Sequence, residues 1–335
     1  MQDNLLTIEN LHTHFFLDEG IVRAVDGIDL AIPRGTTLCL VGESGCGKSV
    51  AAFSVLRLIS SPGRIVEGKI TLHRQQGDID LTALKDDGEA IRKIRGREIA
   101  MIFQEPMTSL SPVHTVGEQI LEMVTLHSGM SKAGAKAHAV KSMERVGIPD
   151  AARRFHQFPH EMSGGLRQRA MIAMALSCSP SLLIADEPTT VLDVTIQAQI
   201  LELMREQQQA LNMSILLITH DLGVVAEMAQ EVAVMYLGRI VEQALVASIF
   251  ATPQHPYTRA LLQSIPGRAP RKTALQAIPG SVPDPFQQIA GCPFHPRCAE
   301  AVAGLCDQGE RPRLLEMEPG HKAACFVRQR ELQRA

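Results

Sequence analysis

The sequence predicts an α/β protein whose central sheet is largely parallel. Three short apolar runs carry this prediction, at residues 37–41, 182–185 and 214–218. Each run has the length of a strand and stands beside a segment in which apolar residues recur with helical spacing. Buried strands that alternate with helices are typical of an α/β domain whose parallel sheet is covered by helices.

The remaining segments complete this predicted architecture. Residues 5–32 alternate apolar and polar positions between glycine and proline breaks, which predicts antiparallel strands. A glycine-rich turn follows residue 41, and residues 48–59 have helical spacing. Residues 107–162 are helical in pattern, so we expect a helical subdomain there. Prolines become frequent after Phe250, and we place a domain boundary near residues 251–255.

The bulk composition excludes several classes of protein. Of the 335 residues, 45% are hydrophobic and 21% are charged, which is typical of a globular chain and not of a disordered one. The net charge of -3, with no Trp and two Tyr, argues against a nucleic-acid partner. The sequence shows no signal-peptide pattern, and no stretch reaches the roughly 18 apolar residues that span a bilayer. We therefore expect a soluble, cytoplasmic chain that depends on other chains for any membrane span.

Residues 42–49 match the whole phosphate-loop pattern G-x-x-x-x-G-K-[ST]. The glycines allow successive backbone N–H groups, and the start of the following helix, to face phosphate oxygens. Lys48 is expected to bridge the β- and γ-phosphates of a nucleotide, and the Ser49 hydroxyl to ligate Mg²⁺. The alternative is a chance glycine-rich turn, against which the predicted strand before the loop and helix after it both argue.

Asp186 and Glu187 directly follow the predicted strand at residues 182–185. Ligands of α/β sheets bind at the carboxyl ends of the strands, which is where these two carboxylates lie. Asp186 is expected to hold Mg²⁺ through water, and Glu187 to polarise an attacking water, a role worth about 10² to 10⁴ in rate. Alone, such a pair is more often a solvated helix start. The phosphate loop upstream favours the catalytic interpretation.

A second candidate anion site lies at Ser163, Gly164 and Gly165, where a helical run begins. One chain does not need two distant anion sites for one ATP molecule. We therefore expect this site to serve a nucleotide that is bound mainly by another subunit. Standing alone, the same residues would be interpreted as a simple helix cap.

In this order and spacing, the phosphate loop, Ser163-Gly164-Gly165 and Asp186-Glu187 resemble the nucleotide-binding domain of ABC transporters. The resemblance implies a P-loop fold with a RecA-like core, an antiparallel β subdomain and a helical subdomain at about residues 107–165. It divides the chain into an ATPase domain at residues 1–252 and a small Cys-rich C-terminal domain at residues 253–335.

The resemblance also assigns individual residues. Gln104 resembles the glutamine that senses Mg²⁺ and water and links to the membrane subunits. His220 resembles the switch histidine that contacts the γ-phosphate; without the family, it could equally be a histidine at a strand end. Leu192-Asp193 resembles the loop that crosses the dimer interface. Phe16 resembles the aromatic residue that stacks on adenine, with Phe15 as a competitor.

The implied sites are therefore three. The catalytic residues are Glu187, His220 and Gln104. The Mg²⁺ ligands are Ser49, Gln104 and Asp186. The ATP contacts are Phe16, Gly42, Glu43, Ser44, Gly45, Cys46, Gly47, Lys48, Ser49, Val50, Ser163, Gly164, Gly165 and Asp193.

Two positions depart from the family pattern, since Met162 stands where Leu is usual and Leu166 where Gln is usual. Neither changes the serine hydroxyl or the glycine backbone, so we expect retained function. Cys46 lies inside the phosphate loop beside a helix start, where thiols are often reactive. We accordingly expect a thiol reagent to block ATP hydrolysis through Cys46.

Residues 185–199, 255–262 and 275–283 resemble the D-type ATPase subunit of oligopeptide and dipeptide importers. The resemblance implies a peripheral subunit at the cytoplasmic face of a bacterial inner membrane. Its implied partners are a second, non-identical ABC ATPase, two transmembrane permease subunits and, indirectly, an extracytoplasmic solute-binding protein. The solute stays open, because nickel, opines, glycopeptides and antimicrobial peptides are alternatives to peptides in this branch.

Four of the seven cysteines lie near the C-terminus, as Cys292-x5-Cys298-x7-Cys306-x18-Cys325. In a reducing compartment such a cluster indicates a metal site before it indicates disulfides. Four thiolates suit zinc or an iron–sulfur cluster, although the C-x2-C pairs of zinc ribbons are missing. D-type subunits include members with a [4Fe–4S] cluster, so the resemblance favours that cofactor over zinc or no metal. His295 and His321 are expected to be exposed loop residues.

Two other functions are compatible with the same motifs. An ABC-type ATPase of DNA repair or chromosome structure would carry a long coiled-coil or zinc insertion between the phosphate loop and Ser163, and the sequence has no heptads there. A non-catalytic module would keep the fold and lose the chemistry, whereas Lys48, Asp186 and Glu187 are all present. We therefore predict an ATP- and Mg²⁺-dependent transport ATPase.

Overall fold

The computed structural model describes residues 3–104, 109–190, 193–264 and 278–333. Its contacts divide the chain into two compact units. The first unit comprises residues 1–5, 32–36 and 83–217, and the second comprises residues 6–31, 37–82 and 218–335. Of the sequence predictions, Leu192, the start of the helical subdomain at Met107, and Leu275 in the C-terminal motif lie outside the described residues.

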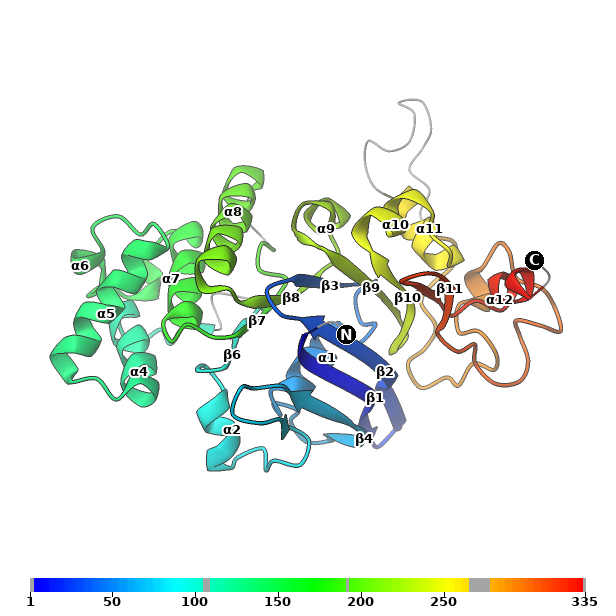
Figure 1. Ribbon diagram of the computed structural model, residues 1–335, viewed down its shortest axis with the longest axis horizontal. Helices are drawn as coiled ribbons and strands as arrows, with labels where there is room; N and C mark the ends of the chain where they lie inside the picture. The colour runs from blue at the N-terminus through cyan, green and yellow to red at the C-terminus, as the bar shows by residue number, and fades with distance from the viewer. Residues whose placement is uncertain (1–2, 105–108, 191–192, 265–277, 334–335) are drawn as a thin grey trace. The chain divides into compact units, whose positions relative to one another are not determined.

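An antiparallel sheet forms one layer of the second unit. Its strands are β1 (Asn4–Leu17), β2 (Gly20–Pro33), β4 (Gly63–Leu72) and β5 (Ile79–Asp80), in the order β2-β1-β4-β5 (Figure 1). The antiparallel strands predicted within residues 5–32 are thereby confirmed. Apolar residues of the sheet are buried, among them Leu6, Leu11 and Ile70.

The strand that precedes the predicted phosphate loop lies in a second sheet of the same unit. β3 (Thr37–Val41) runs parallel to β9 (Glu231–Tyr236), and β10 (Arg239–Leu245) pairs antiparallel with β9. β12 (His321–Ala323) continues from β10, and β11 (Leu315–Glu318) forms the edge. Residues 253–335, which we call the C-terminal extension, therefore contribute strands to this sheet. The boundary between residues 252 and 253 stays a prediction.

Helices of the second unit connect these strands. α1 (Lys48–Val55) follows β3, and α9 (Leu222–Met228) leads into β9. α10 (Val246–Ala251) follows β10. The extension carries α11 (Pro256–Gln263), a 3-10 turn at His295–Arg297 and α12 (Phe326–Leu332). The helix predicted for residues 48–59 is shorter than expected, because Arg57 adopts a left-handed φ of 54° just after α1.

The first unit contains strands β6 and β7, the start of β8, and several helices. β6 (Ile99–Ile102) and β7 (Leu182–Asp186) pair in parallel, and β8 (Ser214–Thr219) begins beside β7. α2 (Glu89–Ile94) precedes β6, and α8 (Val194–Leu211) follows β7. The three apolar runs of the sequence are thus confirmed as strands β3, β7 and β8.

A group of helices in the first unit corresponds to the predicted helical subdomain (Figure 1). Its members are α4 (Val116–Ser128), α5 (Lys132–Arg145), α6 (Ala151–Arg154), a 3-10 turn at Pro159–Glu161 and α7 (Gly164–Leu176). Thr115 and Glu118 form a capping box that begins α4, and Gly129 ends it with a φ of 65°. α7 is the helical run that the sequence predicts to begin at Ser163-Gly164-Gly165, and it ends at Leu176.

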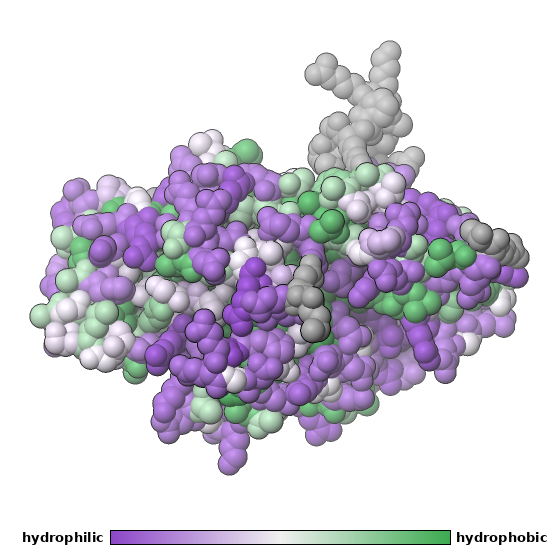
Figure 2. All heavy atoms as spheres, viewed as in Figure 1, coloured by the Kyte–Doolittle hydropathy of each residue, from purple (hydrophilic) through white to green (hydrophobic). Residues whose placement is uncertain are grey.

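Hydrophilic and hydrophobic residues are interspersed over the face of the molecule shown in Figure 2. Among the described residues, no helix combines the length and the apolar character needed to cross a membrane.

Candidate functional site

The phosphate loop connects β3 to α1 in the second unit, as the sequence predicts. Gly42 has a φ of 156°, and Gly47, at the start of α1, has a left-handed φ of 105°. A Cβ atom on Gly42 would overlap the carbonyl oxygen of Met235, and one on Gly47 would overlap that of Ala24. Both positions therefore require glycine on steric grounds as well as for backbone freedom.

Lys48 occupies the centre of this loop. Its side chain is buried, and its ammonium donates hydrogen bonds to the carbonyl oxygens of Gly42 (2.8 Å) and Glu43 (3.0 Å). Two carbonyl groups of the loop itself therefore hold the Lys48 ammonium in place. Ser44 and Gly45 are exposed, and Ser49 and Val50 are half-buried at the first turn of α1.

Cys46 does not have the environment that we expected of a reactive thiol. Its side chain is 4% exposed, and burial raises the pKa of the thiol, although the nearby Lys48 ammonium opposes this shift. A buried, protonated thiol is a poor nucleophile. The burial of the sulfur therefore argues against ready modification of Cys46. Its effect on ATP hydrolysis stays a prediction.

The two aromatic candidates for adenine stacking have different neighbours in the second unit. Phe15 lies against Gly63, where an added Cβ would come within 2.6 Å of its ring. Phe16 has the guanidinium of Arg64 over its ring, 4.2 Å from the centroid. Both rings therefore contact residues of β4, and the choice of Phe16 over Phe15 for adenine stacking stays a prediction.

The carboxylate pair lies at the end of β7 in the first unit. Asp186 is 3% exposed. Glu187 adopts a left-handed φ of 47°, a strained conformation for this residue type that is most often found at functional sites. Gln104 donates from Nε2 to Glu187 Oε2 (3.1 Å), and Thr190 donates from Oγ1 to the same oxygen (2.9 Å). Gln104 and Glu187 therefore meet as the sequence interpretation requires.

Ser163 and Asp193 begin helices in this same unit. The Ser163 side chain accepts a hydrogen bond from Leu166 N (3.4 Å) at the start of α7, and Asp193 accepts one from Ile196 N (3.0 Å) at the start of α8. Nothing lies within 4 Å of a Cβ built on Gly164, so the start of α7 is open to a ligand there. The helix start that the sequence predicts is confirmed.

Gln168 is a residue of this site that sequence reasoning missed. Its side chain is 1% exposed, and its Nε2 donates to the carbonyl of Pro188, the residue after Glu187. This bond ties α7 to the loop that carries the carboxylates. The sequence offers little signal, because Gln168 stands between Arg167 and Arg169 in a polar part of the helical run.

His220 lies in the second unit between β8 and α9. It is exposed, and the next residue, Asp221, caps α9 by accepting from Gly223 N (2.8 Å). The histidine is thus fixed at the carboxyl end of a strand, where the sequence placed it.

Comparison with known proteins bears on these motifs. Residues 25–190 match the family model for ABC transporters, and residues 241–306 match that for the oligopeptide/dipeptide transporter C-terminal region. The oligopeptide transport ATP-binding protein AppD of Bacillus subtilis is 50% identical over 98% of both chains. The dipeptide transport ATP-binding protein DppD of Escherichia coli is 45% identical over 96% of both chains.

The chain belongs to the family of ABC transporter ATP-binding proteins. Solved structures agree on the fold. A dimeric ATP-binding cassette in a post-hydrolysis state, bound to ADP and Pi, has a TM-score of 0.63 at 24% identity and covers 72% of this chain and 98% of its own. CbiO1 from Clostridium perfringens, part of an ABC transporter complex, has a TM-score of 0.61 at 25% identity and covers 75% of this chain and 92% of its own.

The four C-terminal cysteines of this ABC ATPase line one cavity in the second unit. All four are free thiols, and Cys292, Cys306 and Cys325 are buried. Burial raises the pKa of the Cys292 thiol to about 12, and the other three thiols add to the shift. Segments that are distant in the sequence therefore bring their thiols to one buried place.

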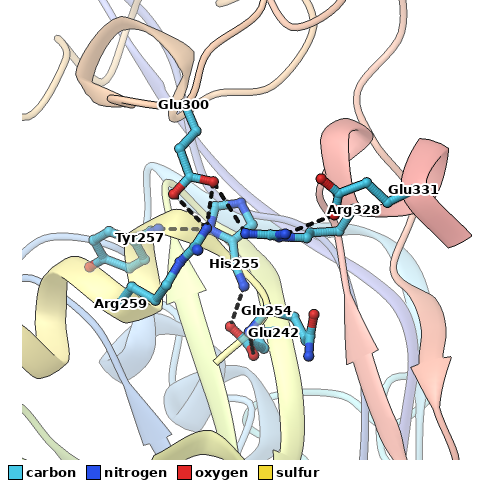
Figure 3. A network of polar contacts seen from close by, with 8 residues as sticks. All are labelled: Glu242, Gln254, His255, Tyr257, Arg259, Glu300, Arg328 and Glu331. Carbon is cyan, nitrogen blue, oxygen red and sulfur yellow. Dashed lines mark hydrogen bonds and ion pairs between the residues drawn. The ribbon is translucent and has the colours of Figure 1, made fainter. Parts of the chain in front are cut away.

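Charged residues hold the segments around these thiols together. Figure 3 shows Glu300, two residues after Cys298, between Arg259 of α11 and Arg328 of α12. Arg259 donates to Glu300 (2.7 Å) and Arg328 donates to the same carboxylate (3.3 Å). These bonds link the loop that carries Cys298 to the helix that begins after Cys325.

The two histidines near the thiols differ from the prediction. His321 is 2% exposed and donates from Nε2 to the buried carboxylate of Glu242 (2.7 Å), so it is no exposed loop residue. It belongs to β12, a strand that the proline-rich tail did not lead us to expect. His295 is half-buried and donates from Nδ1 to the carbonyl of Cys292 (2.9 Å). Neither side chain is therefore simply solvated.

One other set of side chains has metal-ligand chemistry. Among the described residues, the group of three or more His, Cys, Asp or Glu side chains with all ligand atoms within 4.8 Å of one another is His12, His14 and Asp26. Asp26 also binds Arg239 (3.3 Å) and Arg311. A cation at this place would face two arginines, which argues against a metal site there.

Proposed function

We propose that this ABC ATPase hydrolyses ATP to power the import of peptides. The observation that carries the proposal is the pairing of a complete ATPase motif set with the C-terminal region named for oligopeptide and dipeptide transporters. AppD and DppD, which are aligned with nearly the whole chain, are both named as peptide transport proteins. Nickel, opines and other solutes of this branch are weaker candidates because neither name mentions them.

In this proposal the phosphate loop holds ATP from the second unit of the chain. Backbone N–H groups of the loop face the phosphates, Lys48 bridges the β- and γ-phosphates, and Phe16 stacks on the adenine. The bonds from Lys48 to the carbonyls of Gly42 and Glu43 keep the ammonium over the loop until phosphate oxygens replace them. Glycines at 42 and 47 support this role because they permit a close backbone approach.

The hydrolytic step is assigned to Glu187. Its carboxylate accepts the proton of the attacking water, and hydrogen bonds from Gln104 and Thr190 orient it. Ser49, Asp186 and Gln104 would hold Mg²⁺, which neutralises phosphate charge when it is bound. His220 is assigned to the γ-phosphate.

Two subunits are expected to act together. The open helix start at Ser163-Gly164-Gly165 would contact the nucleotide held mainly by a partner ATPase, with Asp193 near the interface. ATP favours the closed dimer through its higher affinity for that state, and this difference lets binding perform work. The partner ATPase is expected to be a different chain, and two transmembrane permeases and an extracytoplasmic solute-binding protein complete the proposed importer. This subunit would then lie peripherally at the cytoplasmic face of the bacterial inner membrane.

The alternative of a DNA-repair or chromosome ATPase finds little support. Between the phosphate loop and Ser163, the longest described helix is α5 with 14 residues. A long coiled-coil arm therefore has no counterpart among the described residues of that region. A non-catalytic module is also disfavoured, since Glu187 is oriented by two hydrogen bonds.

The transport proposal is tested by purifying the tagged chain from detergent-solubilised membranes. We expect two multi-span permeases and a second, non-identical ATPase to co-purify. The reconstituted complex should hydrolyse ATP faster when a peptide-loaded binding protein is added. Recovery of the chain without membrane proteins would contradict the importer.

For the C-terminal thiols we propose a [4Fe–4S] cluster. The donor set fits, because four free thiols line one cavity. The resemblance to D-type subunits favours the cluster over zinc. Its role would be to join the segments of the extension, whose four cysteines line the same cavity.

Replacing Cys325 by serine should remove this cofactor. We expect anaerobically purified protein to carry about four irons per chain with the broad visible absorbance of a cluster, and Cys325→Ser to lose both. Cys178→Ser, at a free cysteine outside the cavity, is the matched control and should keep them. Stoichiometric zinc and no iron in the wild-type protein would support the zinc alternative and overturn the cluster.

A further inference from the structure

The C-terminal extension reaches into the phosphate loop at Glu43. Arg297 donates from Nη1 to Glu43 Oε2 (2.7 Å) and from Nη2 to Glu43 Oε1 (2.9 Å), which is a two-pronged ion pair. The Arg297 side chain is only 4% exposed. Its Nε donates to the carbonyl of Pro279 (3.0 Å), so the arginine is fixed from its own side of the contact.

A second residue of the extension fixes the backbone at the same place. The hydroxyl of Tyr257 accepts a hydrogen bond from Glu43 N (2.9 Å). Tyr257 is 0% exposed and packs against Tyr236 and Phe294, with ring centroids 4.7 and 5.3 Å away. The Tyr257 hydroxyl therefore has little freedom to move, and the Glu43 N–H is held with it.

The backbone carbonyl of Glu43 contacts the lysine that is proposed to bind phosphate. This carbonyl accepts a hydrogen bond from Lys48 Nζ (3.0 Å). Each polar group of this loop residue thus has a partner. The carboxylate has Arg297 and the N–H has Tyr257. The carbonyl has Lys48 and also accepts from Cys46 N (3.3 Å). The extension and the phosphate-binding ammonium are joined through a single residue.

The charge of Glu43 gives this contact a consequence for ATP. A carboxylate in the loop that receives a triphosphate repels it, unless a cation neutralises the carboxylate. Arg297 supplies that cation from a buried position. The other positive charge near the loop, Lys48, is needed by the phosphates.

We propose that Arg297 is a positioning residue for ATP, through which the C-terminal extension sets the nucleotide affinity of the phosphate loop. It neutralises Glu43 and, together with Tyr257, holds the loop in the shape that receives phosphate. The inference rests on ATP binding at this loop, as proposed above. It makes the extension a determinant of ATP affinity in addition to its place in the sheet.

Three variants of the full-length chain test the sign of this effect. In Arg297→Met the Glu43 charge is unopposed, and we expect the Kd for Mg-ATP to rise roughly tenfold, as for one unit charge within about 10 Å of the phosphates at an effective dielectric near 20. Glu43→Gln removes the repelling charge and should bind ATP within about twofold of wild type. The double variant should recover most of the lost affinity. In Arg297→Met, KM should rise with Kd by a larger factor than the turnover number falls.

If Arg297 only anchors the extension, the variants should show a different pattern of ATP affinities. If the ion pair only attaches the extension, Glu43→Gln breaks it as Arg297→Met does, and the two variants weaken ATP binding equally. Arg311→Met is the matched control, because Arg311 also attaches the extension but pairs with Asp26 outside the loop. An effect of Arg311→Met as large as that of Arg297→Met would overturn the proposal.

Two measurements keep these outcomes interpretable. Thermal unfolding and the metal content of each preparation show whether a variant has lost the extension or its thiol cofactor, and Arg297→Lys, which keeps the charge, should retain most of the affinity. Failure of the wild-type chain to bind ATP would instead refute the proposed function. Normal ATP affinity in a folded Arg297→Met protein would refute the proposed role of Arg297 and leave the proposed function of the chain unaffected.

Discussion

Glu187→Gln should abolish ATP turnover and leave ATP binding intact. The amide keeps the shape of the carboxylate and can still accept the hydrogen bond from Thr190 Oγ1, but it cannot take a proton from water. We expect the hydrolysis rate to fall by about 10² to 10⁴, the usual contribution of a general base. The assembled transporter should therefore bind Mg-ATP within roughly twofold of its normal Kd and release almost no phosphate.

The matched control for this change is Glu144→Gln on the exposed side of α5. It makes the same chemical change in the same unit of the chain and should leave turnover unaltered. Gln104→Ala adds a second check, because removing the donor that orients Glu187 should lower the turnover number less than Glu187→Gln does. Turnover of Glu187→Gln close to that of the unmodified protein would show that another group activates the water.

Local motifs explain why the nucleotide-binding parts could be predicted from the sequence. The phosphate loop is one contiguous segment, and its function depends on backbone shape that Gly42 and Gly47 alone make possible. The same holds for Asp186 and Glu187, which follow a strand that its apolar run identifies. In each case the residues that act together are neighbours in the chain, so the sequence motif by itself predicts how they are arranged.

Contacts between distant segments could not be predicted in this way. Nothing in the sequence indicates that Arg297 pairs with Glu43, or that Gln168 binds the carbonyl of Pro188. The burial of Cys46 has the same origin, because its position in the loop indicated reactivity while its burial depends on tertiary contacts. His321 was misjudged because its strand, β12, forms only by pairing with β10 and β11, which lie elsewhere in the sequence.

Glu242 illustrates how such a contact stabilises the extension, and it supports a prediction with a large effect. Its carboxylate is 0% exposed and accepts from Gln254 N (2.6 Å), His255 N (2.8 Å) and His321 Nε2 (2.7 Å). In Glu242→Gln, an amide donor faces one of these donors in the interior. We expect this to cost about 3 kcal/mol of unfolding free energy, the order found when a buried polar pair is broken. Chemical denaturation at pH 7 measures the loss.

The pH dependence identifies the carboxylate as the cause. Burial opposes ionisation of Glu242, but the hydrogen bonds from His321 and the backbone N–H groups outweigh it and hold the pKa of the carboxyl below its usual value of 4.5. A carboxyl with a depressed pKa stabilises the fold fully above its unfolded pKa and loses that contribution as the pH falls through the folded value. The stability difference between wild type and Glu242→Gln should therefore be constant above about pH 5 and shrink below pH 4.5. Glu318→Gln on the exposed edge strand β11 should cost less than about 0.5 kcal/mol, and an equal loss in both variants would show that the buried network does not stabilise the extension.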